Sequence, residues 1–139
     1  MQTKIIPVVA EGRTKRFFSL SLDDADLSRA PHLQLPRVTE AQFALQLADE
    51  GLAGLGIRQG DYLLFGTTQP LRASGQIALI RQEDEYIIRE AHWSGDTTLL
   101  RVPGDIYPEL QLPTENIRIV AVLDNAMKDD EHVQIVHFH

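Results

Sequence analysis

The stretch Gln42–Phe65, QFALQLADEGLAGLGIRQGDYLLF, decides the fold of this chain. Its first part alternates apolar and polar residues through Phe43, Leu45 and Leu47, which is typical of a half-buried strand. A turn with four glycines follows and leads into the strand-like run Asp61–Phe65. The order is therefore strand, exposed turn, strand. Such a turn can present a reactive side chain, because the core holds its flanks while its tip is free.

The beginning of this stretch also carries a helix signal. Thr39 and Gln42 have the spacing of a capping box, and the good helix formers after them favour a helix from Glu40 to about Leu52. Propensity and alternation point to different elements, and the residues by themselves leave both open.

Length and charge limit the classes of function. The chain has 139 residues, which suits one domain whose core needs neither a metal nor disulfides. Its 20 acidic and 13 basic residues give a net charge of -7. Direct binding to nucleic acid or to an anionic membrane needs a basic face, and the only tight basic cluster is Arg13, Lys15 and Arg16. We therefore expect no nucleic-acid partner and no membrane partner.

Cysteine usage and hydropathy indicate the compartment. The absence of cysteine excludes disulfides, thiolate nucleophiles and Cys-ligated zinc. The N-terminal apolar run is broken at Glu11, and no run approaches the length of a membrane span. We expect a soluble, cytoplasmic protein.

The C-terminal region contains one candidate metal site. The run Asp129–His132 precedes His137 and His139, whose spacing puts both side chains on the same side of a strand. A solvated acidic turn followed by a frayed terminus is the favoured interpretation. We therefore expect no metal and no other cofactor.

The first third of the chain gives mixed signals. Lys4–Ala10 is a β-branched run interrupted by Pro7, which favours an edge strand or an extended arm over a central strand. Phe17–Leu22 alternates and predicts a strand, and Asp23–Pro36 predicts a short helical turn followed by a loop. His32 lies in that loop, where a histidine more often faces solvent than acts in catalysis.

The second half has an all-β pattern. Short strand-like runs alternate with turn material, which predicts a twisted, partly closed β-architecture. Trp93 follows one of these runs and is expected to pack in the core, with a partner interface as the alternative. The expected strands are Tyr62–Phe65, Gln76–Arg81, Tyr86–Ala91, Thr98–Val102, Ile117–Leu123 and Val133–Phe138.

Four segments in this order resemble the self-cleaving repressor peptidases of the LexA/UmuD type. Gly56–Leu64, GIRQGDYLL, is similar without gaps to the GI-x-x-GD-x-L-L run of that family. The other segments are Arg72–Ala78, Leu99–Leu110 and Ile117–Val122, so the resemblance covers Phe43–Leu123.

The resemblance implies a mainly β, LexA-like fold of strongly bent antiparallel sheets with few short helices, and it favours the strand at Gln42–Leu47. It implies one structural unit, with a β domain at residues 41–139 and an N-terminal arm at residues 1–40. The arm contains a degenerate cleavage region at Ala10, Glu11 and Gly12. The charged Glu11 stands where the family has a small residue, so a simple turn is the favoured interpretation there.

The family cleaves itself with a Ser-Lys dyad, in which a neutral lysine takes the proton from the serine. Gly51 stands where the serine belongs, and Arg89 stands where the lysine belongs. Glycine has no side-chain atom that can attack a carbonyl, and arginine stays protonated in proteins. The resemblance therefore implies that both catalytic positions are degenerate.

Even without the dyad, we expect the turn to bind a peptide. Backbone N–H groups of Gly51, Leu52, Ala53 and Gly54 could form a cleft that holds an extended peptide without cutting it.

Two functions follow from the resemblance. The first is a catalytically inactive pseudo-peptidase in a stress-response setting, either a homodimer or the partner of a related LexA-like protein. Its expected dimer contacts are Ile117–Leu123 and Val133–Phe138. The second is an active, self-cleaving serine peptidase with its nucleophile elsewhere, for which Ser74 and Ser94 are the candidates. Direct operator binding is not expected, because residues 1–40 are interrupted by prolines and hold no intact helix-turn-helix.

Overall fold

The computed structural model describes residues 4–18, 20–35, 40–66, 75–103, 108–129 and 134–136. Most of these residues belong to one mixed sheet, and the helical structure among them is short. The predicted mainly β fold with few short helices is confirmed. In chain order the elements are β1 (Lys4–Gly12), α1 (Asp24–Arg29), β2 (His32–Leu35), β3 (Phe43–Leu47), η1 (Ala53–Leu55), β4 (Tyr62–Gly66), β5 (Gln76–Gln82), β6 (Glu85–Ser94), β7 (Thr97–Arg101), β8 (Leu110–Pro113), η2 (Thr114–Asn116), β9 (Arg118–Met127) and β10 (Gln134–Val136).

The stretch around the glycine-rich turn forms an antiparallel pair of strands. β3 and β4 pair from Phe43 opposite Phe65 to Gln46 opposite Tyr62. The rings of Phe43 and Phe65 stack, with their centroids 5.7 Å apart. The strand predicted at Gln42–Leu47 is confirmed in β3. The helix alternative is wrong, because strand pairing and burial override the local helix propensity.

Both faces of the β3–β4 pair are buried. Phe43 and Leu45 belong to the largest hydrophobic cluster, whereas Ala44 packs in a second cluster with Ile6 and Leu33. Successive residues of a strand point to opposite faces of the sheet, so the two clusters lie on opposite sides of β3. A third cluster lies among β5, β6 and β7.

β1 lies inside the sheet, between β2 and β3. Its first half pairs antiparallel with β2 as far as Pro7 opposite His32, and its second half, from Val8 to Gly12, pairs parallel with β3. The edge strand or arm predicted at Lys4–Ala10 is therefore wrong, and the sheet is mixed rather than wholly antiparallel. Pro7 has no N–H to donate, and it is tolerated where β1 changes its partner.

β2 replaces the loop predicted after the helical turn. The turn itself is confirmed as α1, but His32–Leu35 pairs with β1 on one side and with β10 on the other. Leu33 and Leu35 are fully buried in this strand. His32 is partly buried, and its Nδ1 lies 2.8 Å from the carbonyl oxygen of Ala30.

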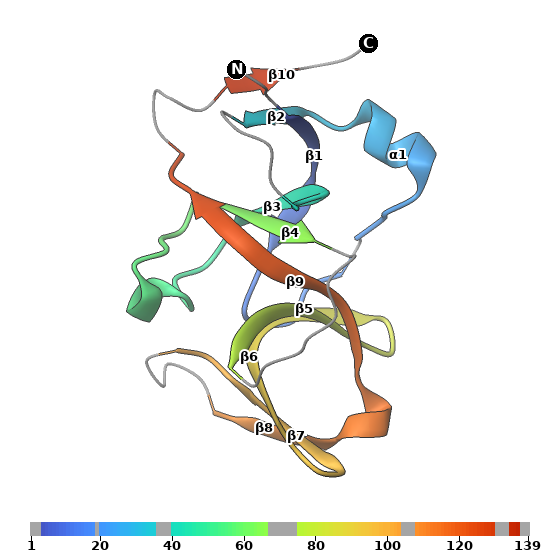
Figure 1. Ribbon diagram of the computed structural model, residues 1–139, viewed down its shortest axis with the longest axis vertical. Coiled ribbons are helices and arrows are strands. Elements are labelled where there is room, and N and C mark those ends of the chain that lie inside the picture. Colours follow the sequence, from blue (N-terminus) through green and yellow to red (C-terminus); the bar gives the residue numbers. More distant parts are fainter. Residues whose placement is uncertain are drawn as a thin grey trace.

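β9 joins the two ends of the molecule. Figure 1 shows it running from the end formed by β5–β8 towards the end formed by β1, β2 and β10. It pairs antiparallel with β4 on one side and with β5 on the other, and it is longer than the predicted strand Ile117–Leu123. The edge facing β4 is paired over Val122–Met127, and the edge facing β5 over Arg118–Val122.

Three predictions in other parts of the chain differ from the structure. In the described part of the strand predicted at Phe17–Leu22, the only pairing is a single bridge between Phe17 and Tyr86. β8 was not predicted. Trp93, expected in the core, is 39% exposed at the end of β6, because β6 extends past the third cluster at that point.

Some predicted features lie outside the described residues. Of the strand predicted at Val133–Phe138, the described part forms β10. No helix in the described part of the chain is long and apolar enough to cross a membrane. The features outside are Thr39, Ser74, the run 130–132, His137 and His139.

The place of β1 inside the sheet predicts unequal roles for two neighbouring isoleucines. Ile6 is 1% exposed, whereas Ile5 is 44% exposed on the other face of the strand. We expect Ile6→Ala to lower the free energy of unfolding by about 2–4 kcal/mol, and Ile5→Ala by less than about 1 kcal/mol. Urea unfolding followed by circular dichroism measures both changes. Equally small losses would show that β1 is an arm.

Candidate functional site

A carboxylate fixes the turn after β3 to the segment after β1. The carboxylate of Asp49 accepts a hydrogen bond from the backbone N–H of Thr14 at 2.9 Å and from its hydroxyl at 3.0 Å. The same carboxylate accepts hydrogen bonds from the N–H groups of Lys15 at 3.3 Å and of Gly51 at 3.0 Å. Asp49 therefore clamps the turn onto residues 14 and 15.

Thr14 occupies the space beside Gly51. A Cβ atom built on Gly51 would lie 1.9 Å from Oγ1 of Thr14 and 2.6 Å from its Cβ. Thr14 is fully buried, so its side chain has little room to move away. Gly51 is thus the residue that this packing requires, and a side chain of any kind at this position would collide with Thr14.

Arg89 binds the other side of the same segment. It lies on β6 and is buried, and its Nε donates a hydrogen bond to the carbonyl oxygen of Thr14 at 2.9 Å. Its Nη1 donates to the carbonyl oxygen of Pro108 at 3.3 Å. The planar guanidinium can serve acceptors in two directions, so Arg89 joins the segment to the loop that precedes β8.

The structure therefore brings Gly51 and Arg89 together through Thr14, which contacts both. The main chain of this segment is held as well. The carbonyl oxygen of Gly12 accepts a hydrogen bond from the N–H of Ala48, and that of Arg13 accepts one from the N–H of Ile88. Residues 12–15 consequently fill the space between the turn and β6.

The residues expected to form a degenerate cleavage region lie on β1, directly before this segment. Ala10, Glu11 and Gly12 pair in parallel with Leu45, Gln46 and Leu47 of β3. The turn predicted at Glu11-Gly12 is wrong, because both residues continue the strand. Glu11 points to solvent, whereas Gly12 is buried against Ile88, whose Cδ1 would lie 2.7 Å from an added Cβ atom.

The four residues of the expected peptide cleft have different environments. Gly51 and Leu52 are buried, and Ala53 and Gly54 belong to η1. The N–H of Gly51 donates to Asp49, and that of Ala53 donates to the carbonyl oxygen of Glu50 at 3.0 Å. Two of the expected donors are thus used within the turn itself.

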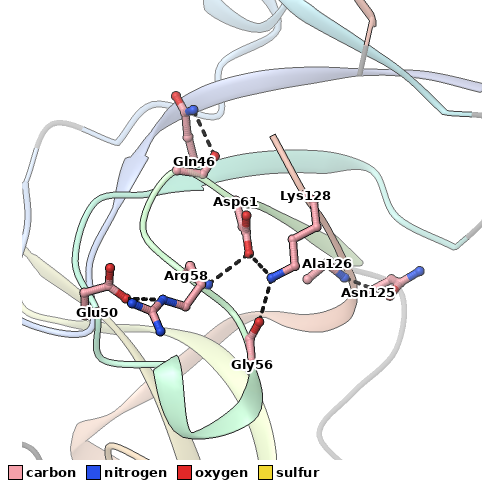
Figure 2. A network of polar contacts seen from close by, with 9 residues as sticks. Gln46, Glu50, Gly56, Arg58, Asp61, Asn125, Ala126 and Lys128 are labelled. Carbon is pink, nitrogen blue, oxygen red and sulfur yellow. Dashed lines mark hydrogen bonds and ion pairs between the residues drawn. The ribbon is translucent and has the colours of Figure 1, made fainter. Parts of the chain in front are cut away.

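An ion pair between Lys128 and Asp61 also holds the turn between β3 and β4 (Figure 2). Nζ of Lys128, just after β9, lies 2.8 Å from Oδ2 of Asp61 and donates to the carbonyl oxygen of Gly56 at 2.6 Å. The N–H of Arg58 donates to the same Oδ2 at 2.9 Å. Lys128 therefore ties the glycine-rich turn to the end of β9.

The pKa of Asp61 reflects this environment. Burial by itself raises the pKa of the carboxyl, but the hydrogen bond and charge of Lys128, together with the N–H of Arg58, outweigh burial and lower the pKa below its ordinary value. Asp61 is therefore a carboxylate at neutral pH, and its contact with Lys128 is an ion pair.

The alternative nucleophiles and metal ligands can be placed only in part. Ser94 lies exposed at the end of β6, where it lines a hollow with His92 and Leu99. Asp129 contacts the amide of Gln46, with Nε2 donating to Oδ2 at 3.3 Å. Among the described residues, no three His, Asp or Glu side chains are grouped to hold a metal.

The chain is similar in sequence to LexA repressors. No family model matches. The LexA repressor of Vibrio vulnificus is 28% identical over 85 residues, which are 60% of this chain and 41% of the repressor. The LexA repressor of Vibrio parahaemolyticus is 29% identical over 73 residues, which are 52% of this chain and 35% of the repressor. The matches thus span about two fifths of these repressors or less, and with the mainly β sheet they support a LexA-like fold.

The contact between Thr14 and Gly51 can be tested by a double-mutant cycle. We expect Gly51→Ala to lower the free energy of unfolding by about 2 kcal/mol or more, because the methyl group overpacks the site. In the Thr14→Gly background the same substitution should cost less than about 1 kcal/mol, because its collision partner is gone. Urea unfolding of the four proteins measures the coupling. An equal cost in both backgrounds would rule out the steric explanation.

The ion pair predicts a pH-dependent contribution to stability. The folded-state pKa of Asp61 is lowered, so its contribution is present above the unfolded pKa and is lost as the pH falls through the folded value. Lys128 is largely exposed and its charge partly screened, so we expect Lys128→Met to cost only about 1 kcal/mol near neutral pH. The cost should shrink below about pH 4, where the carboxyl becomes protonated. Urea unfolding across this range measures it, and a cost independent of pH would contradict the ion pair.

Proposed function

We propose that this chain is a catalytically inactive LexA-like module that acts by association with another protein. The observation that carries the proposal is the occupation of the space beside Gly51 by Thr14. A peptidase needs an exposed nucleophile and a substrate in contact with it. Here the corresponding space is filled by the chain's own residues 12–15, which are held by Asp49 and Arg89.

The chemistry of the two positions supports the same proposal. Gly51 offers no attacking atom. Arg89 stays protonated and donates to a carbonyl oxygen, whereas a general base has to accept a proton. The hydroxyl of Thr14 is buried and hydrogen-bonded to Asp49, so a substrate would reach it only after residues 12–15 had left the site.

The partner we favour is a second copy of the chain, with a related LexA-like protein as the other possibility. β10 and β8 are the two outer strands of the described sheet, and an outer strand presents unpaired N–H and C=O groups to another chain. The C-terminal strand β10 also exposes Ile135. Over Arg118–Val122 one edge of β9 is paired with β5, so the expected contact through Ile117–Leu123 would have to use another side of that strand.

Further parts of this proposal rest on the likeness to LexA repressors. They are a stress-response setting, a location in the cytoplasm, and the binding of an extended peptide near Gly51–Gly54. The N–H groups of Gly51 and Ala53 already donate within the turn, so fewer backbone donors remain for a peptide. The association partner is therefore the stronger part of the proposal.

Self-association is tested by light scattering over a dilution series of the purified chain. We expect a dimer that Ile135→Glu converts into a monomer, because a charge at the pairing edge would be desolvated in the dimer. Phe18→Glu is the control and should leave the dimer intact, since Phe18 is an exposed apolar residue, 58% accessible, that belongs to neither outer strand. A monomer at all concentrations would refute the homodimer.

Inactivity is tested by intact-mass measurement after long incubation from neutral to alkaline pH. We expect one species with the full mass of 15.6 kDa. Two fragments that add up to the whole chain would instead support the self-cleaving peptidase. In that case, loss of cleavage in Ser94→Ala or Ser74→Ala would identify the nucleophile.

A further inference from the structure

An aromatic ring and two guanidinium groups lie in one row across three strands. Arg81 on β5 is opposite Arg118 on β9, and on its other side it is opposite Tyr86 on β6. Residues opposite each other on neighbouring strands point to the same face of a sheet, and like charges in this relation destabilise it. A protein with a net charge of -7 thus keeps two arginines where they repel each other.

Among the described residues, neither of these guanidinium groups forms an ion pair with a carboxylate. Arg81 donates from Nε to the carbonyl oxygen of Glu83, 2.9 Å away in the β5–β6 turn. This bond orients the Arg81 side chain and uses only one of its three nitrogens. By contrast, ion pairs with glutamates are formed by Arg16, Arg58 and Arg101.

Arg81 and Arg118 line two adjoining hollows of unequal character. The first has a volume of about 300 Å³, and its other walls are Leu22, Tyr86, Ile119 and Val120. The second, of about 290 Å³, includes the carboxylates of Glu83 and Glu115, which repel an anion. The ring of Tyr86 is held against Phe17, with the centroids 5.8 Å apart. The first hollow therefore combines two cations with a fixed aromatic wall.

We propose that the first hollow binds a small organic oxyanion. Its carboxylate or phosphate group lies between Arg81 and Arg118, and its apolar part packs against Tyr86 and Leu22. Guanidinium groups bind such oxyanions through paired, charge-assisted hydrogen bonds. The bound anion also removes the repulsion between the two arginines. The volume is at the lower end of ligand sites, which limits the ligand to a small molecule.

Amide signals of the isotope-labelled full chain report binding of phenyl phosphate, benzoate and inorganic phosphate. We expect at least one of the aromatic anions to shift signals of β5 and β9 saturably and to bind more tightly than inorganic phosphate. The tighter of the two identifies a phosphate or a carboxylate ligand. Arg81→Gln and Arg118→Gln should each weaken this binding about tenfold.

Arg29→Gln is the matched control, because Arg29 is an exposed arginine on α1, outside the row. It should leave the affinity unchanged, and the amide spectrum of each variant verifies its fold. Three results would overturn the proposal: no saturable shift at millimolar aromatic anion, inorganic phosphate binding as tightly as the aromatic anions, or an equal loss in Arg29→Gln.

Discussion

The carboxylate of Asp49 is the interaction on which the centre of this molecule depends. It holds Thr14, 35 positions away in the sequence, against the turn that contains Gly51. A charged acceptor makes stronger hydrogen bonds than a neutral one, and its loss would remove the acceptor of the partly buried N–H groups of Thr14 and Gly51. With Thr14 fixed, residue 51 has to be glycine, and Arg89 finds a carbonyl oxygen to bind. Gly51 and Arg89 are thus parts of one packing arrangement around Thr14.

The sequence predicted most strands of the second half, because alternation is a local property that the chain carries wherever it folds. It did not predict that β1 lies inside the sheet. Whether a strand is at an edge depends on its partners. Pro7 indicated an edge strand, because the sequence does not reveal that β1 changes from β2 to β3 at this residue. Local alternation at β3 was also opposed by helix propensity, and burial on both faces decided between them.

Of the residues that meet around Thr14, the sequence singled out two. Gly51 and Arg89 were identified by their positions, and Arg89 also stands out as a charge within an apolar strand. Thr14 and Asp49 were missed, because each is an ordinary polar residue in a polar stretch and only the fold brings them together. Arg81 and Arg118 were missed for the same reason, since a cross-strand pair follows from register and not from local sequence.

Folding has to bring Ala10 beside Leu45, a contact between distant parts of the chain, while β3 and β4 are joined by their own turn. Closing a long loop costs more entropy than closing a hairpin, and non-local pairing slows folding. β1 is made before β3, so its parallel pairing with β3 forms only after β3 has been made. Until then Val8 lacks its partner Ala44, and a newly made chain would be most prone to aggregate through the second half of β1.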